Sequence, residues 1–191
     1  MKKLVLASAS PSRKQILETL GVDFEICPSS YEEDMSLPLK PKELAIHLSQ
    51  GKAREVAKKY KTAVILAADS FAVYQNKLLG KPHTAQKARE MLMMLSGQVH
   101  SFITGFTLIN TDSNQEISDA VESIVYLRKL TSEEINNYLA KENVLEKAGA
   151  YSIQGLGMLL IDKVDGDYSN IRGLPVVVIA HHLKKFGIQL L

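Results

Sequence analysis

The sequence predicts an α/β fold, because segments with the pattern of buried strands alternate with segments of helical spacing. The stretch 4–17 begins as an apolar run of strand length, stops at small residues and continues with apolar residues at helical spacing. The run 62–68 is continuously apolar and bounded by turn residues, as expected of a strand covered on both faces. Helix starts recur further along, and Thr131-Ser-Glu-Glu134 has the sequence of a capping box.

The first strand-to-helix turn is a candidate anion site. Ser10 is placed to cap a helix that starts at Pro11, where the missing N–H costs nothing. The free N–H groups of a helix start, with the hydroxyls of Ser8, Ser10 and Ser12, suit phosphate or carboxylate. A bound anion would also explain Arg13 in the first turn, which the helix dipole disfavours. The alternative is an ordinary strand-to-helix connection with basic surface residues.

Length and composition fit one globular domain over residues 1–191, in one or two lobes, with no sign of disorder. The net charge of +2 and the lack of a basic strip interleaved with aromatics argue against nucleic-acid binding. Cys27 is the single cysteine, which excludes an internal disulfide and a cysteine-based zinc cluster. The first apolar run is too short for a signal peptide, and no run is long enough to span a membrane. We therefore expect a cytoplasmic protein with no membrane partner.

Three acidic residues in a row, Glu32, Glu33 and Asp34, lie in a proline-containing loop after a short strand at 23–26. Such a loop is either solvated surface or a source of oxygen ligands for a divalent metal, which needs a second carboxylate elsewhere. The helical pattern of 42–60 follows, with Lys52 in the apolar stripe of Leu44, Leu48 and Val56. That lysine either extends to the edge of the face or is held inward by a charged partner.

Asp69 and Ser70 follow the apolar run 62–68 directly. Ligands of open α/β sheets gather beyond the carboxyl ends of such strands, so Asp69 is a functional candidate; the alternative is an aspartate that caps a turn. Lys81 is framed by Gly80 and Pro82, which indicates a positioned lysine.

The second half continues the alternation of helices and strands. Thr84 begins a helix ended by Gly97, 99–110 and 117–130 are expected to form a hairpin, and His100 is interpreted as a structural histidine. We further expect a strand at 158–163 and a final helix that starts with Pro175 as its first residue, although 176–179 has strand propensity. Between them the stretch 146–157 contains three glycines that permit close backbone approach, and Gln154 offers an amide suited to a base edge.

Taken in order, these motifs resemble the Maf family of nucleoside triphosphate pyrophosphatases, over residues 4 to about 187. The motifs are Leu6-Ala-Ser-Ala-Ser-Pro with Arg13, Lys52-Ala53, Ala68-Asp69-Ser70, Gly80-Lys-Pro82, Leu95-Ser-Gly97 with His100, Lys147-Ala-Gly-Ala-Tyr151 with Ile153-Gln-Gly155, and Tyr168-Ser-Asn with Gly173-Leu-Pro175. The resemblance implies an inosine-triphosphatase-like fold, a long mixed β-sheet with flanking helices in two lobes around a nucleotide cleft. It also implies cleavage of a nucleoside triphosphate to the monophosphate and pyrophosphate with a divalent metal cation, Mg²⁺, Mn²⁺ or Co²⁺.

The resemblance also assigns roles to single residues. Asp69 would accept the proton, and Glu33 would join it at the metal. Phosphates would be held by Ser8, Ser10 and Arg13, and by the catalytic lysines Lys52 and Lys81, while Gln154 would face the base.

Base choice would depend on three positions, Ser12, Ser70 and Gln154. Family members that act on dTTP and UTP have arginine, threonine and glutamine there, and the 7-methyl-GTP group has glutamate at the third. The chain keeps only the glutamine, so we expect dTTP and UTP to lead by a modest margin, with clearance of non-canonical nucleotides as a related role. The alternatives are a 7-methyl-GTP pyrophosphatase and a non-catalytic nucleotide sensor linked to cell-division arrest. Oligomeric state is left open, with a homodimer among the alternatives.

Overall fold

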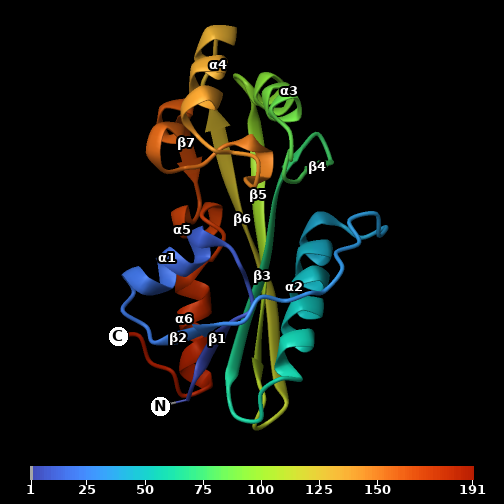
Figure 1. Cartoon of the computed structure of the whole chain (residues 1–191), viewed down its shortest axis with the longest axis vertical. Helices are drawn as coiled ribbons and strands as arrows, with labels where there is room; N and C mark the ends of the chain where they lie inside the picture. Colours follow the sequence, from blue (N-terminus) through green and yellow to red (C-terminus); the bar gives the residue numbers. More distant parts are fainter. Residues whose placement is uncertain (1) are drawn as a thin grey trace.

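The computed structural model describes residues 2–191 and is built on a seven-stranded mixed sheet (Figure 1). Across the sheet the strand order is β2-β1-β3-β5-β6-β7, and β4 pairs with β3. β1 is parallel to β2 and β3, and the remaining pairs are antiparallel. The strands are β1 (Leu4–Leu6), β2 (Phe24–Ile26), β3 (Val64–Tyr74), β4 (Lys77–Leu79), β5 (Val99–Asn110), β6 (Gln115–Leu127) and β7 (Ile161–Asp165). The predicted α/β class with a long mixed sheet is confirmed.

Helices cover the sheet in two groups, one at each end of the long strands β3, β5 and β6 (Figure 1). The helices are α1 (Pro11–Thr19), α2 (Pro41–Ala57), α3 (Ala85–Leu95), α4 (Ser132–Lys141), α5 (Tyr168–Ile171) and α6 (Val176–Lys185), with 3-10 turns η1 (Ala148–Ala150) and η2 (Gly155–Leu160). We call the end with β1, β2, α1, α2 and α6 the basal lobe, and the end with β4, α3, α4, η1, η2 and β7 the distal lobe. Within residues 2–191, no helix is long and apolar enough to cross a membrane.

The alternation of side chains along β3 decides which helix each residue meets. Val64, Leu66 and Ala68 pack in one cluster with α1 and α6, whereas Ile65 and Ala67 pack in another with α2. Because successive strand residues point to opposite faces, Asp69 continues the series that faces α2 and Ser70 the series that faces α1. The distal lobe has its own core, which includes Leu92 of α3, Ile135 of α4 and Val125 of β6.

A break in the sheet lies beside Asp69. β1 pairs with residues 64–66 of β3, and β4 pairs with residues 72–74 of the same edge. No described strand pairs with residues 67–71 on that side, although β5 pairs with them on the other. The sheet therefore leaves an opening between the lobes at the position of Asp69 and Ser70.

Several predicted strand boundaries are wrong, among them the end of the hairpin's second strand, which was expected at 130 and lies at Leu127. The strand expected to stop before Asp69 continues to Tyr74, because β5 and β4 supply pairing partners for residues 70–74 and Phe71 and Ala72 are buried. The stretch expected as a strand from 158 forms the end of η2, and β7 begins only at Ile161. The chain folds tightly there, since a Cβ on Gly157 would lie 1.7 Å from the carbonyl oxygen of Ser152.

Several other predictions are confirmed. Ser10 occupies the N-cap of α1 and Pro11 its first helical position. Thr84 and Thr131 cap α3 and α4 with their hydroxyls, the latter in a capping box. β5 and β6 form the expected hairpin, and residues 176–185 form a helix with Pro175 as its N-cap instead of its first residue.

Candidate active site

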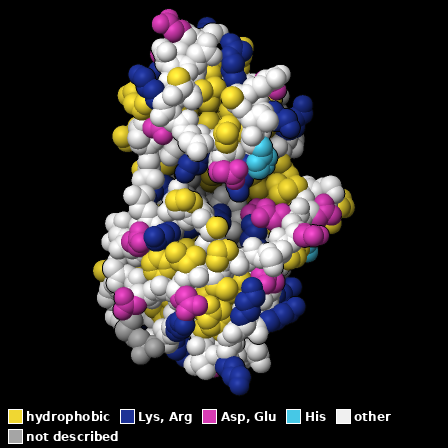
Figure 2. Space-filling model, in the orientation of Figure 1, with side chains coloured by type: hydrophobic (Ala, Val, Ile, Leu, Met, Phe, Trp, Pro, Cys, Tyr) yellow, Lys and Arg dark blue, Asp and Glu magenta, His cyan; other side chains and the backbone are white. Residues whose placement is uncertain are grey.

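A cleft of about 1160 Å³ opens at the break in the sheet, between the two lobes. Figure 2 shows this face hollowed at the waist of the molecule, with acidic side chains and Lys or Arg side chains around the hollow. Every site residue predicted from the sequence lies in the lining: Ser8, Ser10, Ser12, Arg13, Glu33, Lys52, Asp69, Ser70, Lys81 and Gln154. The fold thus brings together residues that are far apart in the chain, since Ser8 and Gln154 are 146 positions apart and line one cavity.

Lys52 and Asp69 form the centre of the cleft. Lys52 points from α2 toward β3, where its ammonium group donates a hydrogen bond to Asp69 Oδ1. The same Nζ lies 2.8 Å from Glu33 Oε1, so one cation joins two carboxylates. The side chains of Lys52 and Asp69 are only 12% and 10% exposed. Lys52 interrupts the apolar stripe of its helix because it is held inward by charged partners.

The pKa of Asp69 is raised above its usual value, first of all because burial disfavours the charged carboxylate. The neighbouring Glu33 carboxylate acts in the same direction, whereas the cations Lys52 and Arg13 oppose the rise. A carboxylate with a raised pKa is a stronger proton acceptor than an exposed aspartate. The environment of Asp69 therefore fits a general base.

Arg13 organises the side of the cleft formed by α1. Its Nε donates to the carbonyl oxygen of Gly173 (3.0 Å), its Nη1 to Ser8 Oγ (3.1 Å) and its Nη2 to Ser70 Oγ (3.0 Å). Burial lowers the pKa of Arg13, and the charges of Asp69 and Glu33 oppose this, but a guanidinium stays protonated in proteins. Arg13 thus brings a fixed positive charge to the point where α1, β3 and the segment before α6 meet.

The start of α1 keeps donors available. Ser10 is the N-cap residue, but its side chain makes no capping hydrogen bond. The N–H groups of the first helical turn have no partner within the helix, so they can serve an anion in the cleft. Ser12, two residues after Ser10, accepts a hydrogen bond of 3.2 Å from Lys147 Nζ through its hydroxyl oxygen.

The distal lobe contributes Lys81 and Gln154. Lys81 Nζ lies 3.0 Å from Glu146 Oε2, and its side chain is 54% exposed at the rim. Gln154 is the N-cap of η2, and its side-chain amide makes no hydrogen bond to another described residue, which leaves both amide groups free for a ligand. Gly149, with φ of +69°, donates its N–H to Gly80 O (3.1 Å) and so joins the two loops that carry these residues.

Two cations of the cleft, Lys147 and Arg172, were given no role from the sequence, although Lys147 opens one of the quoted motifs. Lys147 stands at the start of the glycine-containing stretch, but nothing in its local pattern indicates that it reaches across the cleft to α1. Arg172 donates from Nη2 to Gln15 Oε1 (3.1 Å), while its buried Nε has no partner among residues 2–191. His100, by contrast, is structural as interpreted: it is buried and its Nε2 lies 2.8 Å from the Tyr151 hydroxyl.

The donor set fits a divalent metal that is shared with a phosphate ligand. No group of three His, Cys, Asp or Glu side chains within residues 2–191 could hold a metal by itself. Glu33 and Asp69 nevertheless converge on one point, the ammonium of Lys52. Mg²⁺ is commonly held by one or two carboxylates together with substrate phosphates and water, so these two carboxylates suffice.

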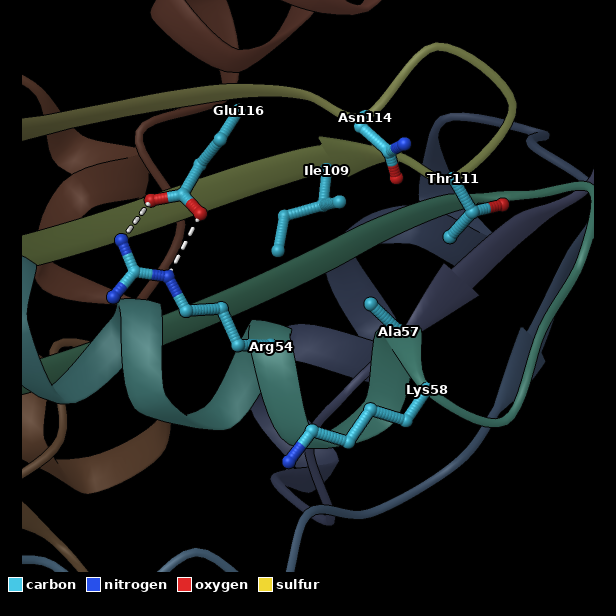
Figure 3. A pocket seen from close by; sticks show the side chains of 7 residues that line it. All are labelled: Arg54, Ala57, Lys58, Ile109, Thr111, Asn114 and Glu116. Carbon is cyan, nitrogen blue, oxygen red and sulfur yellow. Dashed lines mark hydrogen bonds and ion pairs between the residues drawn. The ribbon is translucent and has the colours of Figure 1, made fainter.

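A second, smaller hollow of about 310 Å³ lies between the end of α2 and the β5–β6 turn (Figure 3). Of its two cations, Arg54 and Lys58, the first is already paired with Glu116, from Nε to Oε2 (2.8 Å) and from Nη2 to Oε1 (2.7 Å). The hydrogen bonds with Glu116 raise the pKa of Arg54, so the pair is internally satisfied. This hollow lacks a set of reactive groups comparable with that of the large cleft.

The chain matches one family model and several curated proteins that share one name. A family model described as "Maf-like protein" matches residues 3–186. A protein of Methanosarcina mazei named dTTP/UTP pyrophosphatase is 42% identical over 190 residues, which cover 99% of this chain and 96% of that protein. Proteins of the same name from Thermoanaerobacter pseudethanolicus and Bacillus cereus are 43% and 39% identical, cover 99% of the chain, and are themselves covered to 100% and 92%.

Among solved structures, the Ham1 protein of Staphylococcus aureus matches with a TM-score of 0.46 and 14% identity, over 66% of this chain and 72% of that chain. A HAM1 protein from Coxiella burnetii matches with a TM-score of 0.41 and 17% identity, over 66% and 73%.

Proposed function

The chain belongs to the Maf family, and on this premise we propose that it is a nucleoside triphosphate pyrophosphatase that converts dTTP and UTP to the monophosphate and pyrophosphate. The observation that carries the proposal is the buried Asp69, paired with Lys52 and open to a cleft rich in cations. Such a site offers a proton acceptor beside groups that can neutralise a polyphosphate.

The reaction adds water across the anhydride bond between the α- and β-phosphates. Asp69 orients the water and accepts its proton, for which its raised pKa is suited. Lys52 holds Asp69 in place, while Arg13 and Lys81 face the charge that develops on the phosphate oxygens. Lys81 exchanges its rim partner Glu146 for the substrate. The products leave as the nucleoside monophosphate and pyrophosphate.

The cofactor would be a divalent cation, Mg²⁺, Mn²⁺ or Co²⁺, and Glu33 and Asp69, whose carboxylates meet at Lys52 Nζ, would hold it together with the phosphates. When bound, it neutralises the phosphate oxygens and favours departure of pyrophosphate.

Base choice is assigned to Gln154, because its amide has both a donor and an acceptor and no described side-chain partner. It can pair with the adjacent O4 and N3–H groups of uracil or thymine, whereas a purine presents a different edge. The Ser70 hydroxyl, unlike the Gln154 amide, already has partners: it accepts from Arg13 Nη2 (3.0 Å) and lies 2.9 Å from Thr104 Oγ1.

A panel of nucleoside triphosphates tests the assignment. With Mg²⁺ or Mn²⁺ present, pyrophosphate release is expected to be fastest from dTTP and UTP, with CTP and purine triphosphates turned over more slowly. Gln154→Ala is expected to reduce the difference in rate between dTTP or UTP and the other nucleotides, since each lost discriminating contact is worth about 1–3 kcal/mol. Gln86→Ala, on the exposed side of α3, serves as a control that keeps the ranking. A tenfold preference for 7-methyl-GTP, or binding without turnover, contradicts the proposal.

A further inference from the structure

Lys147 crosses the cleft. It lies in the loop between α4 and η1 of the distal lobe, and its Nζ donates a 3.2 Å hydrogen bond to Ser12 Oγ in the first turn of α1. Because Ser12 belongs to the basal lobe, this bond joins the two walls of the cleft directly.

Lys147 forms no ion pair with any of residues 2–191 in the free protein. Three lysines line the cleft, and the other two have carboxylate partners: Lys52 has Asp69 and Glu33, and Lys81 has Glu146. Within residues 2–191, no carboxylate oxygen lies within 4.0 Å of Lys147 Nζ, and its hydrogen-bond partner is a neutral hydroxyl. A partly buried cation is poorly compensated by one hydroxyl, whereas an anionic oxygen adds the attraction of an opposite charge.

The backbone holds this lysine in place. The N–H of Lys147 donates to the carbonyl oxygen of Val144 (2.9 Å), and its own carbonyl oxygen accepts from Ala150 N–H (3.0 Å). Gly149 follows in a left-handed conformation, where an added Cβ would lie 3.2 Å from the ring of Tyr151 and 3.3 Å from Ala72 Cβ. The loop is therefore packed against the distal core, and this packing fixes the backbone from which the Lys147 side chain extends into the cleft.

We propose that Lys147 is a substrate-binding residue that contacts a phosphate group of the nucleoside triphosphate from the wall opposite Asp69 and Arg13. The inference rests on the proposed function and adds a cation that the sequence motifs did not assign. When substrate enters, an anionic phosphate oxygen replaces the hydroxyl of Ser12 as the partner of Lys147, next to the free N–H groups of the α1 start. The same contact links the distal lobe to the bound nucleotide.

Steady-state kinetics of Lys147→Met with dTTP and UTP tests the contact. The expected result is a fall in kcat/KM of about tenfold to a hundredfold, the usual range for loss of one charged hydrogen bond. The factor is expected to be equal for the two nucleotides, because a phosphate contact does not distinguish bases. Lys147→Arg, which keeps the charge, is expected to recover most of the loss, and the unfolding temperature of both variants is expected to stay near that of the wild type.

Lys141→Met is the matched control, since Lys141 is an exposed lysine of the same lobe outside the cleft lining. It is expected to keep wild-type kinetics. Wild-type kcat/KM in Lys147→Met, a loss confined to one nucleotide, or no recovery in Lys147→Arg overturns the inference while leaving the proposed function intact.

A wild-type enzyme that releases pyrophosphate from no nucleotide refutes the proposed function itself. In that case, isothermal titration calorimetry with inorganic pyrophosphate still tests whether Lys147 binds a phosphate group, because it does not depend on catalysis. Weaker binding by Lys147→Met than by Lys141→Met supports the contact, and equal binding overturns it.

Discussion

The ammonium group of Lys52 is shared by two carboxylates that differ in their surroundings. Asp69 is buried and its pKa is raised, whereas the Glu33 side chain is 44% exposed on the loop before α2. Lys52 Nζ contacts only one oxygen of each carboxylate, so the second oxygen of each would be available to a divalent metal. Under the proposed function, Asp69 would orient the water and help to bind the metal, whereas Glu33 would bind the metal only.

Glu33→Gln tests this division of roles. The variant is expected to need about tenfold more Mg²⁺ for half-maximal pyrophosphate release, because it loses one charged metal ligand. A chelator is expected to abolish the activity of the wild type. Glu32→Gln is the matched control, since Glu32 is the exposed neighbour and lines no part of the cleft. An enzyme indifferent to chelator, or equal metal requirements in both variants, contradicts the role of Glu33.

His100 predicts a pH dependence of stability that is separate from catalysis. Burial lowers its pKa from 6.5 to about 4 in the folded protein. Above pH 6.5 the imidazole is neutral in both states, but between 6.5 and 4 only the unfolded chain binds the proton. Stability is therefore lost as pH falls, by about 2 kcal/mol between pH 7.5 and pH 5.

Denaturant unfolding of wild type and His100→Gln at pH 7.5 and pH 5 measures the contribution of His100 to the unfolding free energy. The wild type is expected to lose about 2 kcal/mol more than the variant, because all other titrating groups are common to both. His83→Gln, whose side chain is 66% exposed, is expected to follow the wild type. Equal losses in wild type and His100→Gln would show that His100 does not cause the dependence.

At the scale of elements, β3 shows what the sequence could and could not predict. The apolar run 62–68 identified the strand, and its end was expected at Asp69. The strand continues because β4 and β5 pair with residues up to Tyr74, and such long-range pairing has no local signal. Asp69 still faces the cleft, since the parallel neighbour β1 stops at Leu6. Asp69 thus reaches the cleft for a different structural reason than expected, and its role as proton acceptor stays a prediction.

The contact between α2 and β5 fixes the distance between Lys52 and Asp69. Gly105 is the register partner of Asp69, and a Cβ on it would lie 2.3 Å from the backbone carbon of Ala45 in α2. Gly105→Ala must therefore push α2 away from the sheet. We expect a loss of about 1–3 kcal/mol in unfolding free energy and a lower kcat, as Lys52 moves with its helix.

Gly51→Ala is the control for this prediction. A Cβ on Gly51 would meet the end of the Tyr31 ring at 2.3 Å, and that ring can rotate away. Alanine also has the higher helix propensity, by about 1 kcal/mol. Stability within about 1 kcal/mol of the wild type is expected for Gly51→Ala, and the same for Gly105→Ala would contradict the packing argument.

At the scale of the whole molecule, the cleft exists because separate lobes meet at the break in the sheet. Local sequence could identify Lys52, which interrupts an apolar stripe, and the resemblance of motifs assigned Arg13, Lys81 and Gln154. Neither the local sequence nor the resemblance could show that Lys147 and Arg172 line the same cavity, because their positions depend on how the distal lobe packs. The homodimer named among the alternatives stays a prediction.

The initial rate of pyrophosphate release from dTTP by Asp69→Asn is the most direct test of Asp69 as the proton acceptor of a pyrophosphatase. We expect kcat to fall by about a hundredfold or more, with the variant folded and dTTP still bound, because the amide cannot accept the proton. Asp162→Asn, at an exposed position of β7, is expected to keep the wild-type rate. Near wild-type turnover by folded Asp69→Asn would show that Asp69 is not the proton acceptor.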